Sequence, residues 1–371
     1  VEVWLLDLPS DGENVNSLAA KGLERLKDPD MPGLMSEEAE KLIKIGNTRD
    51  HFQELEDCDW IAEAVVERLD IKQSLYQRLN ESCKEATIIT SNTSTIPISL
   101  LTKGMPKKFC ERFAITHFFN PVRFMRLLEL VRGEFTRDDV INTLDLFSET
   151  MLGKGVVSCS DTPGFLANRV GVFAIQCALH KAFEYKLSPT EADAFFGRPL
   201  GLPKTGVFGL YDLIGIDLMA DVVKSLVSIL PENDVFHKYS SPIEIMTDMI
   251  ANGQTGNKNE KGFYKQVGDE RQVIDLSSGN YGVHERLKTP LLEEAEKIGI
   301  SFIIKDTSPY GLYIWDVISE TLCYAASLVP EVTDDLTQID DAMKLGYNWV
   351  QGPFELLDEI GIEYFVDRLK V

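Results

Sequence analysis

The amino-acid sequence predicts an α/β protein, in which a doubly wound domain is followed by two duplicated all-α domains. Three observations predict this architecture. Short apolar segments alternate with helical segments up to about residue 158. From Pro163 onward the hydrophobic pattern has only a helical period. A motif in this helical part recurs 146 residues later, at Gly352 after Gly206.

Five segments in the first part are predicted to be strands of one mainly parallel sheet. Each is apolar and rich in β-branched or aromatic residues, as buried strands are. They are residues 1–6, 60–66, 86–90, 113–116 and 125–131. Helical patterns separate them, at residues 18–26, 36–45 and 70–83. A last helix, with Thr136 as its N-cap and two aspartates in its first turn, is expected to close the domain.

The helical part is expected to contain two copies of one unit. Its longest helical pattern covers residues 165–185. In the repeated motif, Gly206, Asp212 and Gly215 correspond to Gly352, Asp358 and Gly361. We therefore expect domains at residues 1–158, 159–266 and 290–371, with the polar residues 267–290 as a linker.

The composition argues against several classes of function. Acidic residues outnumber Lys and Arg by 59 to 37, which gives a net charge of −22 and disfavours nucleic acid as a partner. No apolar run approaches the ~20 residues that span a bilayer. The six cysteines contain no CxxC pair and the five histidines show no metal-ligand spacing, so neither a disulfide framework nor a metal site is expected. Reduced cysteines indicate a cytoplasmic protein.

Candidate catalytic residues follow two of the predicted strands. Ser94 belongs to the segment SNTS after the third strand, and His117 ends the fourth. Ligands of doubly wound sheets collect at the carboxyl ends of parallel strands, where both side chains are expected. Taken alone, Ser94 would be a turn or cap residue and His117 a structural histidine.

Glu129 is the expected partner of His117. Period-two alternation places its carboxylate on the same face of the fifth strand as Met125, Leu127 and Val131. A carboxylate on an apolar face needs a hydrogen bond or a cation to offset its burial. His117, on the preceding strand, would supply one. A histidine oriented by a carboxylate is a general base that can remove a hydroxyl proton.

Two further polar residues are candidates for ligand binding. Asn168 falls in the first turns of the helix that opens the all-α part, and its amide can donate to a carbonyl or alkoxide oxygen. Asp7 ends the first strand, where an acid accepts hydrogen bonds from the ribose of NAD and disfavours the 2′-phosphate of NADP. The ordinary interpretations are an exposed helix residue for Asn168 and a turn residue for Asp7.

Together these segments resemble the 3-hydroxyacyl-CoA dehydrogenase family. The matching motifs occur in the family's order over residues 1–265, and the C-terminal repeat continues to residue 371. They are AEAVVERLDIK (62–72), SNTS (91–94), HFFNPV (117–122) with Glu129 twelve residues after His117, DTPGFLANR (161–169) and KNEKGFYK (258–265). The resemblance implies a Rossmann-type NAD domain and an enzyme of fatty-acid β-oxidation that interconverts (S)-3-hydroxyacyl-CoA and 3-oxoacyl-CoA with NAD.

The resemblance also implies roles for individual residues. His117 resembles the general base or acid, Glu129 its partner, and Ser94 and Asn168 the groups that hold the substrate oxygen. The positions that resemble cofactor contacts are Asp7, Glu67, Lys72, Asn120 and Lys258.

The second helical copy resembles that of the long, multifunctional members, in which the dehydrogenase is fused to an enoyl-CoA hydratase; a thiolase is a further expected partner. Residues 306–311 read DTSPYG where the first copy has DTPGFLANR, without the Asn-Arg pair. We therefore expect this copy to be structural and to pack on the first as an internal pseudo-dimer. The glycine-rich cofactor loop and its strand would precede Val1, so an N-terminally truncated sequence from a longer protein is expected.

Two alternative functions compete with this interpretation. One is a non-catalytic relative that kept the fold for a binding or structural role. This alternative does not explain the presence of the full set of candidate catalytic residues, Ser94, His117, Glu129 and Asn168. The other is a different two-domain nicotinamide enzyme, such as a β-hydroxyacid or sugar-phosphate dehydrogenase, which leaves the HFFNPV segment unexplained.

Overall fold

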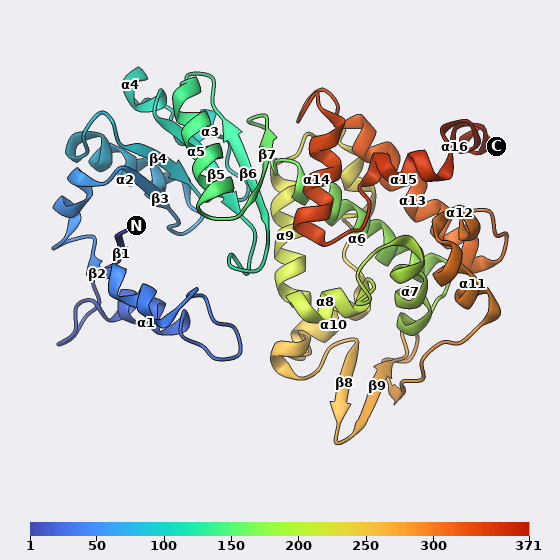
Figure 1. Cartoon of the computed structure of the whole chain (residues 1–371). Coiled ribbons are helices and arrows are strands. Elements are labelled where there is room, and N and C mark those ends of the chain that lie inside the picture. Colours follow the sequence, from blue (N-terminus) through green and yellow to red (C-terminus); the bar gives the residue numbers. More distant parts are fainter. Residues whose placement is uncertain (371) are drawn as a thin grey trace. The chain divides into compact units, whose positions relative to one another are not determined.

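A computed structural model describes residues 1–370 as two compact units, residues 1–161 and residues 162 onward (Figure 1). The first unit contains a five-stranded sheet in the order β3-β4-β5-β6-β7. Its strands are β3 (Trp60–Glu63), β4 (Ile88–Ser91), β5 (Phe113–Phe118), β6 (Leu127–Arg132) and β7 (Gly155–Cys159). The α/β class expected from the sequence is confirmed.

The sheet is mixed, because β6 runs antiparallel to β5, while the pairs β3–β4, β4–β5 and β6–β7 are parallel. Only residues 119–126 join β5 to β6. So short a connection suits antiparallel neighbours, whereas a parallel pair needs a crossover of a dozen residues or more. The prediction of a mainly parallel sheet missed this reversal, and its five strands wrongly included residues 1–6 and lacked β7.

Helices cover the sheet as the apolar periodicity requires. They are α2 (Leu69–Ser82), α3 (Ile98–Leu101), α4 (Lys107–Cys110) and α5 (Asp138–Thr150). Val140 and Leu144 of α5 pack on Ala114 and Leu130 of the sheet. The prediction of Thr136 as the N-cap of α5 was wrong, because Arg137 holds that position. The Thr136 hydroxyl instead donates to the carbonyl of Phe113 at 2.6 Å.

A second, two-stranded parallel sheet pairs β1 (Val3–Asp7) with β2 (Ile43–Asn47). The first unit also contains α1 (Ser17–Arg25) and two 3-10 helices, η1 (Glu37–Leu42) and η2 (Phe52–Asp57). The prediction of a helix over residues 36–45 was wrong, because η1 ends at Leu42 and β2 follows at once. Ile43 and Ile45 alternate with Lys44, which is the period of a strand.

The second unit is mainly helical, and the helices α6 (Ala167–Glu184) and α13 (Pro309–Ser327) pack against each other in it. Before α13 come α7 (Pro189–Phe195), η3 (Arg198–Leu200), α8 (Phe208–Ile214), α9 (Ile216–Ile229), η4 (Val235–Tyr239), α10 (Glu244–Ala251), η5 (Asn257–Asn259), α11 (Pro290–Ile298) and α12 (Ile300–Ile303). After it come α14 (Leu336–Tyr347), α15 (Pro353–Ile360) and α16 (Ile362–Leu369).

The segment predicted as a linker, residues 267–290, instead contributes β9 (Glu270–Ile274) and β10 (Tyr281–Val283) to an antiparallel sheet with β8 (Tyr264–Val267) (Figure 1). These strands are short, and their exposed side chains include polar ones such as Glu270 and Arg271, so composition alone made the segment look like a connection. The ring of Tyr281 lies beneath the ammonium of Lys265 at 4.1 Å, and its hydroxyl donates to the carbonyl of Gly262 at 2.5 Å.

One local arrangement occurs twice in the second unit. An aspartate accepts a hydrogen bond from the backbone at the start of a helix: Asp193 from Phe208 at 2.7 Å, and Asp340 from Phe354 at 2.8 Å. A glycine lies against the aspartate each time, since a Cβ on Gly206 would lie 2.4 Å from the Cα of Asp193 and one on Gly352 would lie 2.2 Å from the Cα of Asp340.

The glycines that follow these two helices, α8 and α15, also correspond to each other. Gly215, between α8 and α9, has φ 112°, and Gly361, between α15 and α16, has φ 90°. L side chains rarely adopt such positive φ values. The glycine in each copy of the motif therefore permits one helix to end and the next to start within a single residue.

Raising the pH is expected to remove stability that depends on Asp193. Burial raises the pKa of this carboxyl from 3.8 to about 7, so between these values the folded state binds more protons than the unfolded state. The stabilising contribution of Asp193 is therefore fully present below about pH 4 and is lost as the pH rises to about 7. Over this range the free energy of unfolding falls by at most about 1.4 kcal/mol per pH unit.

Urea unfolding between pH 4.5 and 7.5 tests this expectation. The free energy of unfolding of the wild type should fall relative to that of Asp193→Asn as the pH rises. Asp221→Asn, at an exposed position of α9, is the control and should leave the pH profile unchanged. A difference between wild type and Asp193→Asn that stays constant over this range would contradict the expectation.

Within residues 1–370, no helix combines the length and hydrophobicity needed to cross a membrane. In the same residues, no group of three or more His, Cys, Asp or Glu side chains is arranged to hold a metal ion.

Candidate active site

His117 and Glu129 lie directly opposite each other in the antiparallel ladder of β5 and β6. Residues opposite each other in such a ladder project from the same face of the sheet. The His117 Nδ1 and the Glu129 Oε2 are 2.6 Å apart. Glu129 is completely buried, and 7% of the His117 side chain is exposed. The carboxylate thus fixes which imidazole nitrogen faces it, whether that ring is neutral or charged.

Glu129 has a second polar neighbour, which the sequence did not single out. The Sγ of Cys159, at the end of β7, lies 3.8 Å from the Glu129 Oε1. Since β7 is the parallel neighbour of β6, the carboxylate is held from the strands on both of its sides.

The loop that contains Ser94 lies beside the strand that contains His117. This loop, residues 92–95, follows β4, and β4 is the parallel neighbour of β5, so both strands end at the same edge of the sheet. The Asn92 Oδ1 accepts a hydrogen bond at 2.9 Å from the backbone N–H of Phe118, the residue after His117. The structure therefore brings the loop and the histidine strand together.

Glu67 also reaches this loop. Its Oε1 accepts hydrogen bonds from the backbone N–H of Ser94 at 3.2 Å, from the Thr95 hydroxyl at 3.1 Å, and from the hydroxyl of Thr93. The Glu67 side chain is 42% exposed. One carboxylate therefore faces solvent and organises the loop at the same time.

Lys72 lies beneath Glu67 and is almost inaccessible to solvent, with 1% of its side chain exposed. Its Nζ is 2.7 Å from the Oε1 of Glu63 and 3.3 Å from the Oε2 of Glu67. A long lysine chain is seldom buried unless its charge is paired, and here both partners are carboxylates.

The sequence reasoning missed Glu63, whose side chain is completely buried at the end of β3. Besides Lys72, its donors are the backbone N–H of Val65 at 2.7 Å, the Tyr76 hydroxyl at 2.5 Å and the Ser91 hydroxyl at 2.7 Å. Burial raises the pKa of Tyr76, so this hydroxyl stays protonated and donates. A carboxylate within the apolar segment WIAEAVV is the same kind of signal that singled out Glu129.

Asp7 and Asn120 are both exposed. Asp7 ends β1 in the two-stranded sheet, and its Oδ1 accepts a hydrogen bond from the N–H of Leu8 at 2.7 Å. Asn120 follows β5, just beyond His117. An exposed carboxylate at the carboxyl end of a parallel strand fits the ribose hydroxyls of a dinucleotide, and Glu67 meets the same description after β3.

Asn168 and Lys258 belong to the second unit. Asn168 is the second residue of α6 and is half-buried. Lys258 lies in η5, and both carboxylate oxygens of Asp217 are 2.6 Å from its Nζ. Of the residues predicted from the sequence, the structure thus gathers Ser94, His117, Glu129, Glu67 and Lys72 in the first unit.

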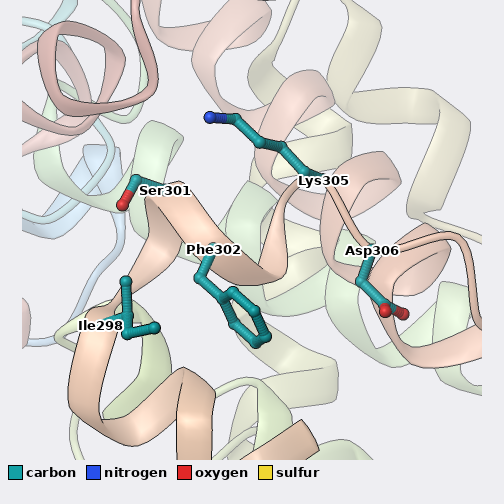
Figure 2. Close-up of a pocket in the computed structure, with 5 residues that line it drawn as sticks. All are labelled: Ile298, Ser301, Phe302, Lys305 and Asp306. Atoms are coloured by element: carbon teal, nitrogen blue, oxygen red, sulfur yellow. The ribbon is translucent and has the colours of Figure 1, made fainter.

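Two surface hollows of the second unit are lined by none of these residues. One, of about 620 Å³, lies over residues 285–288. The other, of about 410 Å³, lies on α11, α12 and the following turn (Figure 2). Figure 2 shows Lys305 extending away from Phe302 rather than converging with it on one point. A ligand site needs convergent polar groups, so the hollow in Figure 2 does not compete with the residues above.

Comparison with known proteins gives matches over most of the chain. Residues 1–162 match the family described as "3-hydroxyacyl-CoA dehydrogenase, NAD binding domain" and residues 164–266 its "C-terminal domain". A "Probable 3-hydroxyacyl-CoA dehydrogenase" of Deinococcus radiodurans is 36% identical over 73% of this chain and 78% of its own length. A "Putative fatty acid oxidation complex trifunctional enzyme" of Rickettsia prowazekii is 38% identical over 96% of this chain, which spans 49% of that relative.

Solved structures agree with the fold. The crystal structure of 3-hydroxybutyryl-CoA dehydrogenase from Escherichia coli K12 covers 100% of this chain and 88% of its own, with a TM-score of 0.72 and 23% identity. That of (S)-3-hydroxybutyryl-CoA dehydrogenase from Ralstonia eutropha covers 71% of this chain and 89% of its own, with a TM-score of 0.54 and 29% identity.

Proposed function

Because the chain belongs to the family of NAD-dependent 3-hydroxyacyl-CoA dehydrogenases, we propose that it interconverts (S)-3-hydroxyacyl-CoA and 3-oxoacyl-CoA in fatty-acid β-oxidation. The observation that carries this proposal is the buried pair of His117 and Glu129, with 2.6 Å between Nδ1 and Oε2.

The proposed mechanism assigns the proton transfer to His117. With Nδ1 facing Glu129, Nε2 is the atom that takes the proton of the 3-hydroxyl in oxidation and returns it in reduction. The Glu129 carboxylate stabilises the imidazolium that forms, and burial strengthens this interaction because solvent screens it little. NAD, when bound, supplies the hydride transfer.

The remaining predicted residues hold the ligands. Ser94 and Asn168 orient the substrate oxygen, as the family resemblance implies, and the hydrogen bonds of Glu67 and Asn92 support a fixed position for the Ser94 loop. Asp7, Glu67, Asn120 and Lys258 are proposed to contact NAD directly. The carboxylate of Asp7 favours NAD over NADP, since it would repel a 2′-phosphate.

We further propose that the helical part of the chain consists of two copies of one domain, at residues 159–266 and 290–371, which form an internal pseudo-dimer. The matched aspartates Asp193 and Asp340, together with their glycines, support this duplication. The relatives named as trifunctional enzymes are about twice as long as this chain, which supports fusion to a further domain such as an enoyl-CoA hydratase.

Oxidation of NADH with acetoacetyl-CoA and with longer 3-oxoacyl-CoA substrates tests the proposal. We expect turnover that depends on the CoA thioester and is slower with NADPH. If the folded protein binds NADH and turns over none of these substrates, a non-catalytic relative of the family becomes the better description. Oxidation of a β-hydroxyacid that lacks CoA, measured with NAD, separates this proposal from that of a different nicotinamide dehydrogenase.

A further inference from the structure

We propose that Lys154 is a positioning residue, which holds the loop of residues 119–126 by its backbone carbonyls and so keeps Phe119 against the His117 ring. The inference rests on the proposed function, because this position matters for catalysis only if His117 transfers the proton. The sequence reasoning did not single out Lys154, which directly precedes β7.

Lys154 is a buried cation without an ion-pair partner among residues 1–370. Only 9% of the residue is exposed. Its Nζ donates hydrogen bonds to the carbonyls of Val122 and Met125, the second at 2.8 Å. Burial lowers the pKa of this ammonium, as expected for a cation without a counter-ion. Lysine is almost never buried unless it is paired, so the two carbonyls must offset the cost of its burial.

The two carbonyls belong to the loop that follows His117. In the described part of the chain, neither accepts a hydrogen bond from a backbone N–H. The loop turns here, because the Pro121 carbonyl accepts the N–H groups of Phe124 at 2.9 Å and Met125 at 3.0 Å. Lys154 therefore supplies donors to two backbone acceptors that would otherwise be left to solvent.

The backbone around Lys154 is fixed from two sides. Its N–H donates to the carbonyl of Ser148 in α5 at 3.0 Å. The N–H of Gly155, the first residue of β7, donates to the carbonyl of Arg126 at 2.9 Å. The Nζ also lies 5.8 Å from the centroid of the Phe118 ring, which is within the range of a cation–π contact. The ammonium thus reaches the loop from a fixed position between α5 and β7.

Phe119, the first residue of the loop, connects it with His117. The centroids of the two rings are 5.0 Å apart, with 59° between the ring planes. Without the bonds from Lys154, Phe119 would be free to move away and water would reach the imidazole. Solvent would then screen the interaction between the imidazole and Glu129, which is strong because it is buried.

Hydrogen exchange tests the hold of Lys154 on the loop without requiring turnover. Lys154→Met replaces the ammonium by an apolar group and leaves both carbonyls without these donors. We expect the amides of residues 119–126 to exchange about tenfold faster in this variant, with those of β5 and β6 unchanged. Mass spectrometry of peptides from the loop measures the rates. Lys154→Arg keeps the charge and the N–H donors, so it should restore slow exchange at least in part.

Steady-state kinetics test the link from the loop to His117. In Lys154→Met, kcat for reduction of a 3-oxoacyl-CoA should fall about 10- to 100-fold, which is the effect of a small misplacement of a catalytic group. Lys154→Arg should recover part of this loss, in step with the exchange rates of the loop.

Arg112→Met is the matched control. Arg112 is also a buried cation of the first unit, 4% exposed, and it donates to the backbone carbonyls of Lys84 at 2.7 Å and Thr87 at 3.1 Å. It precedes β5 and therefore lies at the other end of this strand from His117. Its replacement should lower the melting temperature but leave kcat and the exchange of residues 119–126 unchanged.

The outcomes separate this inference from the proposed function. Loop exchange that is equal in wild type and Lys154→Met would overturn the inference alone, and so would faster exchange with an unchanged kcat. Equal losses of kcat in Lys154→Met and Arg112→Met would show a merely structural role and would also overturn it. A wild type that turns over no 3-oxoacyl-CoA would overturn the proposed function, and with it the catalytic part of the inference. If Lys154→Met does not fold, Lys154→Gln takes its place, because its amide keeps N–H donors without the charge.

Discussion

Replacing His117 with alanine is expected to lower kcat for NADH-dependent reduction of a 3-oxoacyl-CoA by about 100- to 10,000-fold, the usual contribution of a general acid or base. The variant removes the only proton donor in the proposed mechanism while the strand around it stays in place. The Kd for NADH should change little, because the proposed cofactor contacts lie on other residues. Steady-state kinetics and a fluorescence titration measure the two quantities.

His237→Ala is the matched control for this prediction. His237 is half-buried in η4 of the second unit, and its Nε2 lies 2.9 Å from the carbonyl of Pro231. It should keep wild-type kcat. A His117→Ala protein that is folded and retains more than about a tenth of wild-type kcat would contradict the assignment of His117 as the proton donor.

Replacing Arg169 with methionine is expected to destabilise the fold by about 3 to 5 kcal/mol. The guanidinium is 2% exposed and lies 3.0 Å from the Glu331 carboxylate and 3.2 Å from the Tyr324 hydroxyl. It also pairs with Asp234, whose side chain is 7% exposed. Methionine fills part of the volume but leaves Asp234 buried without its counter-ion.

Denaturation by urea measures this loss as a change in the free energy of unfolding. Arg198→Met removes an exposed arginine of the same unit and should cost less than about 0.5 kcal/mol. A loss of similar size in both variants would show that the ion pairs of Arg169 do not stabilise the fold.

The pairing of His117 with Glu129 could be foreseen because it follows from two local rules. Alternation along a strand says which side chains share a face, and a carboxylate on an apolar face demands a partner. Glu63 obeys the same rule in residues 60–66, but the side chains that pair with it come from α2 and from the end of β4. Only the folded chain brings those elements together, so its partners could not be read from its neighbours in the sequence.

The direction of β6 and the short strands with polar or half-exposed side chains were harder to predict for another reason. The reversal at β6 depends on the length of a loop, and β2 and β8–β10 are short, with polar or half-exposed side chains. In such segments composition resembles a helix or a connection, and hydrogen bonding to a neighbouring strand decides the structure. The burial of Lys72 was missed because lysine is usually exposed. Its two carboxylate partners offset the free-energy cost of burying its charge.

The cross-strand position of His117 and Glu129 makes their geometry a property of strand pairing. The distance between the two side chains depends on the register of β5 and β6. Residues 123–126, which lie beyond the HFFNPV segment, can therefore change in composition while the two catalytic candidates keep their separation. A slip of the register by one residue would instead turn Glu129 to the opposite face of the sheet and end the proposed proton transfer.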